Sequence, residues 1–307
     1  MMKAFTLILF LIISNGLVAQ PFDLRLRTKK KQELEYSITT SLAITQFVDG
    51  VQSLTKMEIK NEISLEVKNI RNDKIEITSR YKKLSLDLEF EESAMSINSE
   101  STDERDTFSK ILSQLVDKPF QLSISEKGEI LEFSGLSKII DGAFTDYKEL
   151  PQAKIDQLKG QLNKAFGEEA LKGNIQSFIT IFPSNPVNEK DTWRIETSFN
   201  DGMSASIESD FILEDVRKNQ AKIISTGIIE SLDKEKYFEL NGNYFKYNLV
   251  GTTDSDIVLD PETGQVIEAI THQDISGDSF LKPNDHIDED VTISIEISNK
   301  TVITRLN

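Results

Sequence analysis

Cysteine does not occur among the 307 residues of this sequence. Disulfide bonds, thiolate metal sites and cysteine nucleophiles are therefore excluded. We also expect no lipid anchor on an N-terminal cysteine, the usual tether of exported bacterial proteins. The fold has to be stabilised by its core alone.

Histidine is almost as rare, because only His272 and His286 are present. The sequence contains no H-E-x-x-H, G-x-S-x-G, G-x-G-x-x-G or phosphate-loop motif. Ser-x-x-Lys occurs at 53–56, 79–82 and 231–234, but none of these opens a predicted helix and no Lys-Thr-Gly accompanies them. We therefore predict that the protein is not an enzyme, with no catalytic, cofactor-binding or metal-ligating residue. A cleft that pairs either histidine with a serine and a carboxylate would instead indicate a hydrolase.

Positive charge is in deficit, since 35 Lys and Arg face 51 Asp and Glu and the formal net charge is -16. This balance argues against nucleic acid as a partner and disfavours anionic membrane surfaces. One basic cluster departs from it, formed by Arg25, Arg27 and Lys29 to Lys31. Apolar residues make up 38% of the chain, which is typical of a globular protein.

Acidic residues concentrate in the segment Asp285–Asp290, which also holds His286. Such a group of oxygen ligands could bind calcium or another divalent cation. The spacing and the glycine of an EF-hand are missing, so we favour a solvated acidic loop. Asp254 and Asp256 receive the same interpretation.

Residues 1–19 have the pattern of a cleavable signal peptide. Lys3 supplies the positive charge, and the apolar stretch 4–13 is too short to span a bilayer. Ala19 precedes the expected cleavage site. We predict a periplasmic or secreted protein that is neither integral to a membrane nor lipid-anchored.

Two-residue periodicity dominates the rest of the sequence and predicts long β-strands with one buried face. Apolar residues fall on even positions from Leu34 to Ile44 and on odd positions from Met57 to Val67. Within 75–90 the phase slips between Tyr81 and Leu84, which indicates a β-bulge and a bent strand. Long bulged antiparallel strands are typical of curled sheets.

Helical periodicity interrupts this pattern and divides the chain. We predict a first β-rich half at 20–135, a helical insertion at 136–181 and a second β-rich half at 182–307, with the two halves forming one continuous domain. The insertion is interpreted as a cover packed on the sheet, with a lid or a dimerisation surface as the alternative. Both halves contain a hairpin with a charged, glycine-containing turn, which suggests an internal duplication.

The boundary at 182–193 contains two prolines, a polar turn and Trp193, the single tryptophan. We interpret Trp193 as an anchor at the edge of the core rather than a residue that stacks on a ligand. Here Pro186, Val187, Asp191 and Trp193 resemble an uncharacterised family of exported bacterial proteins, a domain of unknown function of about this length with the element Pro-Val-x-x-Gly-Asp-x-Trp. The turn at 260–264 also fits, whereas Lys190 replaces the glycine. The resemblance implies a fold and an exported location, but no activity.

The sequence thus predicts a β-dominated α+β fold of long antiparallel curled sheets or half-barrels, in two related halves with helices between them. Such sheets have an apolar concave face. We expect a non-enzymatic exported protein that binds or carries an apolar or amphipathic ligand, such as a lipid. The alternative is a structural or protein-interaction module of the cell envelope.

Overall fold

A computed structural model describes residues 20–307 except 49, 92, 148, 202, 241–242 and 284–288. The predicted signal peptide, His286 and most of the acidic segment therefore lie outside the described residues. Within them, no helix has both the length and the apolar character needed to cross a membrane.

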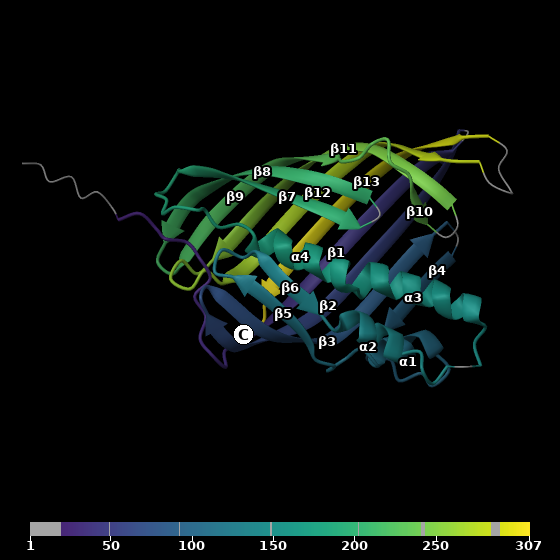
Figure 1. Ribbon diagram of the computed structural model, residues 1–307, viewed down its shortest axis with the longest axis horizontal. Helices are drawn as coiled ribbons and strands as arrows, with labels where there is room; N and C mark the ends of the chain where they lie inside the picture. The colour runs from purple at the N-terminus through teal and green to yellow at the C-terminus, as the bar shows by residue number, and fades with distance from the viewer. Residues whose placement is uncertain are drawn as a thin grey trace, which may run out of the picture.

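One antiparallel sheet of thirteen strands forms the body of the protein (Figure 1). Its strands run in the order β6-β5-β3-β2-β1-β13-β12-β11-β9-β8-β7, with β4 paired to β3 and β10 paired to β11. The predicted β-dominated fold of long curled antiparallel strands is confirmed. The strands are β1 (Glu33–Val48), β2 (Val51–Arg71), β3 (Lys74–Phe90), β4 (Ser93–Asn98), β5 (Phe120–Ser125), β6 (Ile130–Ser134), β7 (Thr192–Asp201), β8 (Met203–Arg217), β9 (Gln220–Ser231), β10 (Phe238–Leu240), β11 (Asn243–Leu259), β12 (Val266–Leu281) and β13 (Val291–Arg305).

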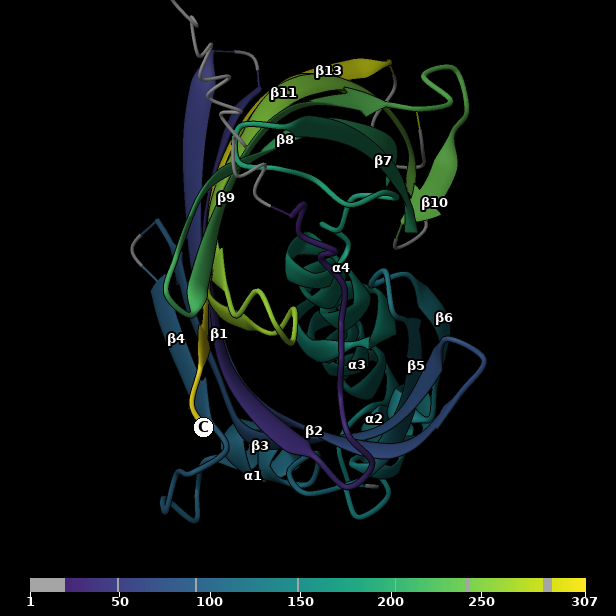
Figure 2. The ribbon, with the colours of Figure 1, turned by 90° about the vertical axis from the view of Figure 1, so that its left-hand side faces the viewer.

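The sheet bends into a deep trough (Figure 2). Part of the bend comes from a bulge in β3, where Glu62 pairs with Lys83 while Ile63 pairs with Tyr81. The extra residue lets Tyr81 and Leu84 both face inward, and both are about 1% exposed. The phase slip in the sequence therefore predicted this bulge correctly.

Helices α1 (Thr107–Ser113), α2 (Leu136–Gly142), α3 (Gln152–Phe166) and α4 (Glu168–Ile179) lie inside or against the lower part of the trough (Figure 2). Their apolar residues share one core with β1, β2, β3 and β5. Helices α2 to α4 fall within the predicted insertion, and they cover the sheet as expected. The division into two related halves stays a prediction.

The proline-marked boundary is anchored by Trp193. Its ring stacks on Phe211 at 5.8 Å, and its Nε1 donates to the carbonyl of Ile181 at 2.9 Å. The anchor interpretation is therefore confirmed. Lys190, which stands where the resemblance predicts a glycine, has a φ of 72°. Its backbone therefore has the left-handed conformation that glycine adopts most easily.

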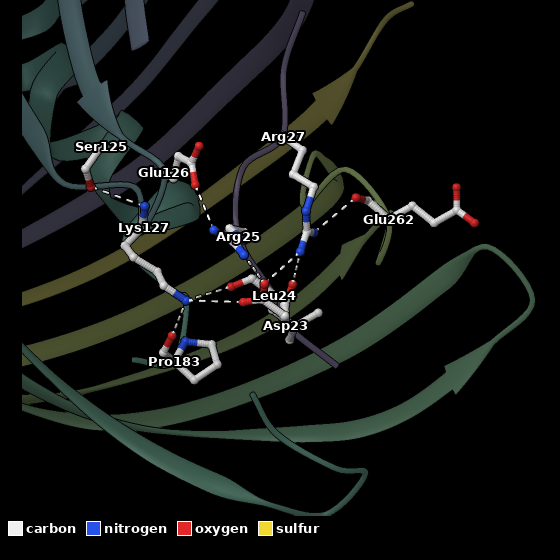
Figure 3. A network of polar contacts seen from close by, with 9 residues as sticks. All are labelled: Asp23, Leu24, Arg25, Arg27, Ser125, Glu126, Lys127, Pro183 and Glu262. Atoms are coloured by element: carbon white, nitrogen blue, oxygen red, sulfur yellow. Dashed lines mark hydrogen bonds and ion pairs between the residues drawn. The ribbon is translucent and has the colours of Figure 1, made fainter. Parts of the chain in front are cut away.

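Residues 20–32 form a strap that joins three segments far apart in the sequence. The strap pairs with Val187, with Glu126 and with Thr263 through backbone hydrogen bonds of 2.7 to 3.0 Å. Lys127 reinforces it, because its ammonium group donates to the carbonyls of Leu24 at 3.2 Å and Pro183 at 2.7 Å (Figure 3).

Candidate ligand-binding face

The register of the strands shows which side chains share the concave face, because directly opposite residues project to the same side of a sheet. Ile38 of β1 lies opposite Ile303 of β13, and both are buried beneath the helices. It follows that even-numbered residues of β1 and odd-numbered residues of β11, β12 and β13 face into the trough.

Two adjacent rows of polar side chains cross this concave face, and we call them the polar band. The first row passes from β9 to β1 and the second from β8 to β13, each through paired positions. The members of the band are Ser225, Ser255, Thr271, Thr301 and Thr40 in the first row, and Ser209, Thr253, Gln273 and Asn299 in the second. The expectation of an apolar inner face is wrong here, although it holds for the core beneath the helices.

Hydrogen bonds between neighbouring strands satisfy part of the band. The hydroxyls of Ser255 and Thr271 are 2.9 Å apart, and Asn299 Nδ2 donates to Gln273 Oε1 at 2.9 Å. The Oδ1 atom of Asn299 is buried and accepts no hydrogen bond from the described residues. The band therefore retains capacity to bind a polar group.

Helix α4 roofs the polar band. Its apolar side, which includes Ile175 and Phe178, packs into the core, whereas the other side presents small and polar residues such as Ala170 and Ser177. Between that side and the band lies a cavity of about 260 Å³. Its described lining contains an acidic residue, Glu169, but no lysine, arginine or histidine.

A row of isoleucines follows the polar band on the side away from the main core. The row contains Ile207, Ile229, Ile275, Ile297 and Ile44. Gly251 interrupts it on β11, where an added Cβ would lie 2.8 Å from the Ile275 side chain. The first three isoleucines belong to a small cluster that contains no described helix residue.

The candidate catalytic and metal-binding residues of the sequence do not come together on the concave face. His272 lies on the convex face, opposite Asp254 and Lys300, and does not line the cavity. Asp256, on the same face, pairs with Lys222 at 3.2 Å. Among the described residues no group of three or more His, Asp or Glu could hold a metal ion. Residues 285–288 of the acidic segment lie outside the described residues.

The Ser-x-x-Lys sequences also lie away from helix starts. Two fall inside β2 and β3, and the third begins at the last residue of β9. Sequence reasoning did not find the polar band. The sequence does contain polar residues two positions apart, Thr253 with Ser255 and Asn299 with Thr301. Only the register of the strands shows that these pairs lie side by side in the same two rows.

The fold and this face define a β-dominated protein with one curved antiparallel sheet and a helix-roofed cavity on its concave side. The chain belongs to the family of unknown function DUF6263, whose profile matches residues 72–266. No curated protein matches the sequence.

Two solved structures are similar in outline. Lipovitellin, from a structure titled for its lipid–protein interactions, has a TM-score of 0.49 and 13% identity over 92% of this chain. This chain spans only 26% of that one. The COG4313 outer membrane channel from Pseudomonas putida F1 has a TM-score of 0.25 and 7% identity, covering 94% of this chain and 100% of the channel. At these TM-scores neither structure informs the function of this protein.

Proposed function

We propose that the protein is a non-catalytic, exported binding protein for an amphipathic ligand held on the concave face of the sheet. The observation that carries the proposal is the cavity of about 260 Å³ between α4 and the polar band, bordered by the isoleucine row. Ligand sites in proteins combine a concave apolar surface with a few convergent polar groups, and this face has both.

The ligand's polar group would lie in the cavity and its apolar part on the isoleucine row. The isoleucine row lies two residues along each strand from the nearer row of the polar band, a distance of roughly 7 Å at about 3.4 Å per residue. One ligand molecule can therefore contact both the polar band and the isoleucine row. A volume of about 260 Å³ accommodates a small polar group rather than a whole lipid, so the apolar part must extend beyond the cavity.

The charge of the lining favours an uncharged polar group. Hydroxyls and amides can bind hydroxyl, ester or amide groups of a ligand. A carboxylate or phosphate in this cavity would find no cation among the described lining residues, because the one charged residue of the lining is Glu169, which is exposed and pairs with Lys172 at 3.9 Å. We therefore favour a neutral amphiphile, such as a monoacylglycerol, over a fatty-acid anion.

Native mass spectrometry of protein purified without detergent tests for a retained amphiphile. Titration with a monoacylglycerol and with a fatty acid of equal chain length then tests the preference. We expect tighter binding of the monoacylglycerol. The absence of a retained species together with no binding of either compound would contradict the proposal.

A substitution on α4 tests the location of the site. Ala170→Phe places a ring in the cavity and is expected to abolish monoacylglycerol binding. Ala153→Phe is the matched control, because Ala153 is an exposed helix residue of α3 that does not line the cavity. Equal affinity in the two variants would place the ligand elsewhere.

A protein-interaction module is the second candidate, and the free edge of β7 favours it. This strand ends the sheet order, with pairing among the described strands only to β8. An open edge can pair with a strand of another protein. Crosslinking in cells that captures one dominant protein partner through β7 would favour this function over ligand binding.

A further inference from the structure

The basic cluster of the strap forms a second surface, which is positively charged although the protein as a whole is acidic. The part of the cluster that matters here is the turn Lys29 to Lys31, which contains three consecutive lysines. All three are exposed, and none forms an ion pair with a described residue within 4.0 Å. Arg27 differs, because its guanidinium already donates to Asp23 and to the carbonyl of Glu262 (Figure 3).

Backbone hydrogen bonds hold the lysine turn in place. Lys31 N donates to the carbonyl of Val67 at 2.8 Å, and Val67 N donates to the carbonyl of Gln32 at 2.8 Å. Within the turn, Gln32 N donates to the carbonyl of Lys29 at 2.9 Å, while Lys29 N donates to Gln32 Oε1 at 2.9 Å. The three ammonium groups therefore project from a backbone fixed on β2, which lowers the ordering cost of binding.

A groove of about 330 Å³ lies beside this turn, and Gln265 forms part of its wall together with Thr263 and the lysines. Gln265 is only 5% exposed, and its Nε2 atom has no hydrogen-bond partner among the described residues. Arg305 Nη1 donates to the Oε1 atom of Gln265 at 3.4 Å. Because a guanidinium can only donate, this contact assigns the oxygen to Arg305 and leaves the two N–H hydrogens for another acceptor.

We propose that this groove is an anion-binding site for a phosphate group, which Lys29, Lys30 and Lys31 attract and the Nε2 atom of Gln265 binds. Phosphate oxygens only accept hydrogen bonds from such donors, and charge-assisted bonds of this kind are the stronger ones. The net charge of -16 does not oppose the site, since screening confines exposed charges to about 10 Å at moderate salt. The site shares no lining residue with the cavity under α4, so it stands independently of the function proposed above.

The first experiment titrates the purified protein with inorganic phosphate at an ionic strength of about 0.1 M, where screening is effective, by isothermal calorimetry. We expect saturable binding that is about tenfold weaker in Gln265→Glu. This variant keeps the shape of the side chain but replaces the donor with a carboxylate. The triple variant Lys29→Gln/Lys30→Gln/Lys31→Gln is expected to lose binding.

A matched control separates a site from general attraction to positive charge. Lys138→Gln/Lys234→Gln/Lys236→Gln removes the same charge from exposed positions outside the groove and should bind phosphate as the unaltered protein does. Equal loss in both triple variants, or no effect of Gln265→Glu in a folded protein, would overturn the proposal. So would the absence of saturable phosphate binding combined with the absence of vesicle binding.

A second arm identifies the source of the phosphate group. Sedimentation with phosphatidylglycerol vesicles and with phosphatidylcholine vesicles tests for a lipid headgroup. Retention on phosphatidylglycerol alone, lost in the lysine triple variant, would assign the site to an anionic lipid. Phosphate binding without vesicle retention would assign it to a soluble phosphate or phosphomonoester.

Discussion

The hydroxyl of Tyr81 donates a hydrogen bond of 2.9 Å to the carbonyl oxygen of Phe166, so the bulge of β3 is joined to the last residue of α3. Tyr81 is about 1% exposed, and its ring also contacts Phe120 and Phe166. The sequence feature that bends the sheet is therefore also the point where a covering helix is fixed to it.

Tyr81→Phe should destabilise the protein by about 1–3 kcal/mol, because the Phe166 carbonyl is left buried without its donor. Urea unfolding measures the change. Tyr147→Phe serves as control, since the Tyr147 ring is only partly buried against the core and the loss should be smaller. Equal losses in the two variants would show that the hydrogen bond contributes nothing specific.

Alkaline pH should destabilise the protein through its buried tyrosines. Burial raises the pKa of Tyr81 and of Tyr36 well above the ordinary value near 10. Above that pH the unfolded chain loses both protons while the folded chain keeps them, so ionisation favours unfolding. The free energy of unfolding should fall by about 1.4 kcal/mol per pH unit for each tyrosine above pH ~10.

Urea unfolding across this pH range measures the slope, and Tyr81→Phe provides the internal check. The variant lacks one of the two tyrosines, so its alkaline slope should be smaller by about 1.4 kcal/mol per pH unit, whereas Tyr36, Tyr147 and Tyr247, whose pKa is also raised, keep their contributions. A slope that does not change would assign the alkaline loss to other groups.

The position of the strap should depend on Gly264, because Gly264 packs directly against the backbone of Arg25 and a side chain there would collide with it. Gly264 has a φ of 68°, and an added Cβ would lie 2.0 Å from the carbonyl oxygen of Arg25. Gly264→Ala should therefore displace residues 20–32 and cost more than the 1–2 kcal/mol of the left-handed conformation, about 2–4 kcal/mol. Faster proteolysis within the strap, followed by mass spectrometry, would report the displacement.

Gly50→Ala is the matched control for this substitution. Gly50 has a similar φ of 80°, but nothing lies within 4 Å of the added Cβ. Its cost should stay near the conformational contribution, about 1–2 kcal/mol. If Gly264→Ala costs no more than Gly50→Ala and proteolysis is unchanged, the strap is not held by this contact.

Sequence periodicity predicted the strands, the β3 bulge and the helical cover because each is a local pattern. Alternation fixes the buried face of a strand, and the slip between Tyr81 and Leu84 fixes a bulge. The polar band was not predictable in this way. Its rows combine residues of strands that lie far apart in the sequence, such as Thr40 and Thr301, which are 261 positions apart and which the register of β1 with β13 places opposite one another.

The groove beside the lysine turn was hidden for a different reason. The cluster Lys29 to Lys31 is evident in the sequence, but Gln265 comes from the hairpin between β11 and β12. That hairpin reaches the turn only because the strap crosses the open end of the sheet, as the Arg27 contact with Glu262 shows (Figure 3). Pairing of a strap with a distant hairpin leaves no periodic signal in either segment.

The polar band gives the sharpest test of ligand chemistry, because one strand carries a threonine on each face. Thr253 faces the cavity, whereas the adjacent Thr252 is exposed on the convex face. Thr253→Val replaces a hydroxyl with a methyl group of similar size, so it removes one hydrogen-bonding group from the cavity. Monoacylglycerol affinity should fall about two- to tenfold, the equivalent of about 0.5–1.5 kcal/mol.

Thr252→Val is the matched control and should leave monoacylglycerol affinity unchanged. Urea unfolding should give the two variants similar stability. An equal affinity for Thr253→Val and Thr252→Val would mean that the polar group of the ligand does not bind in the band.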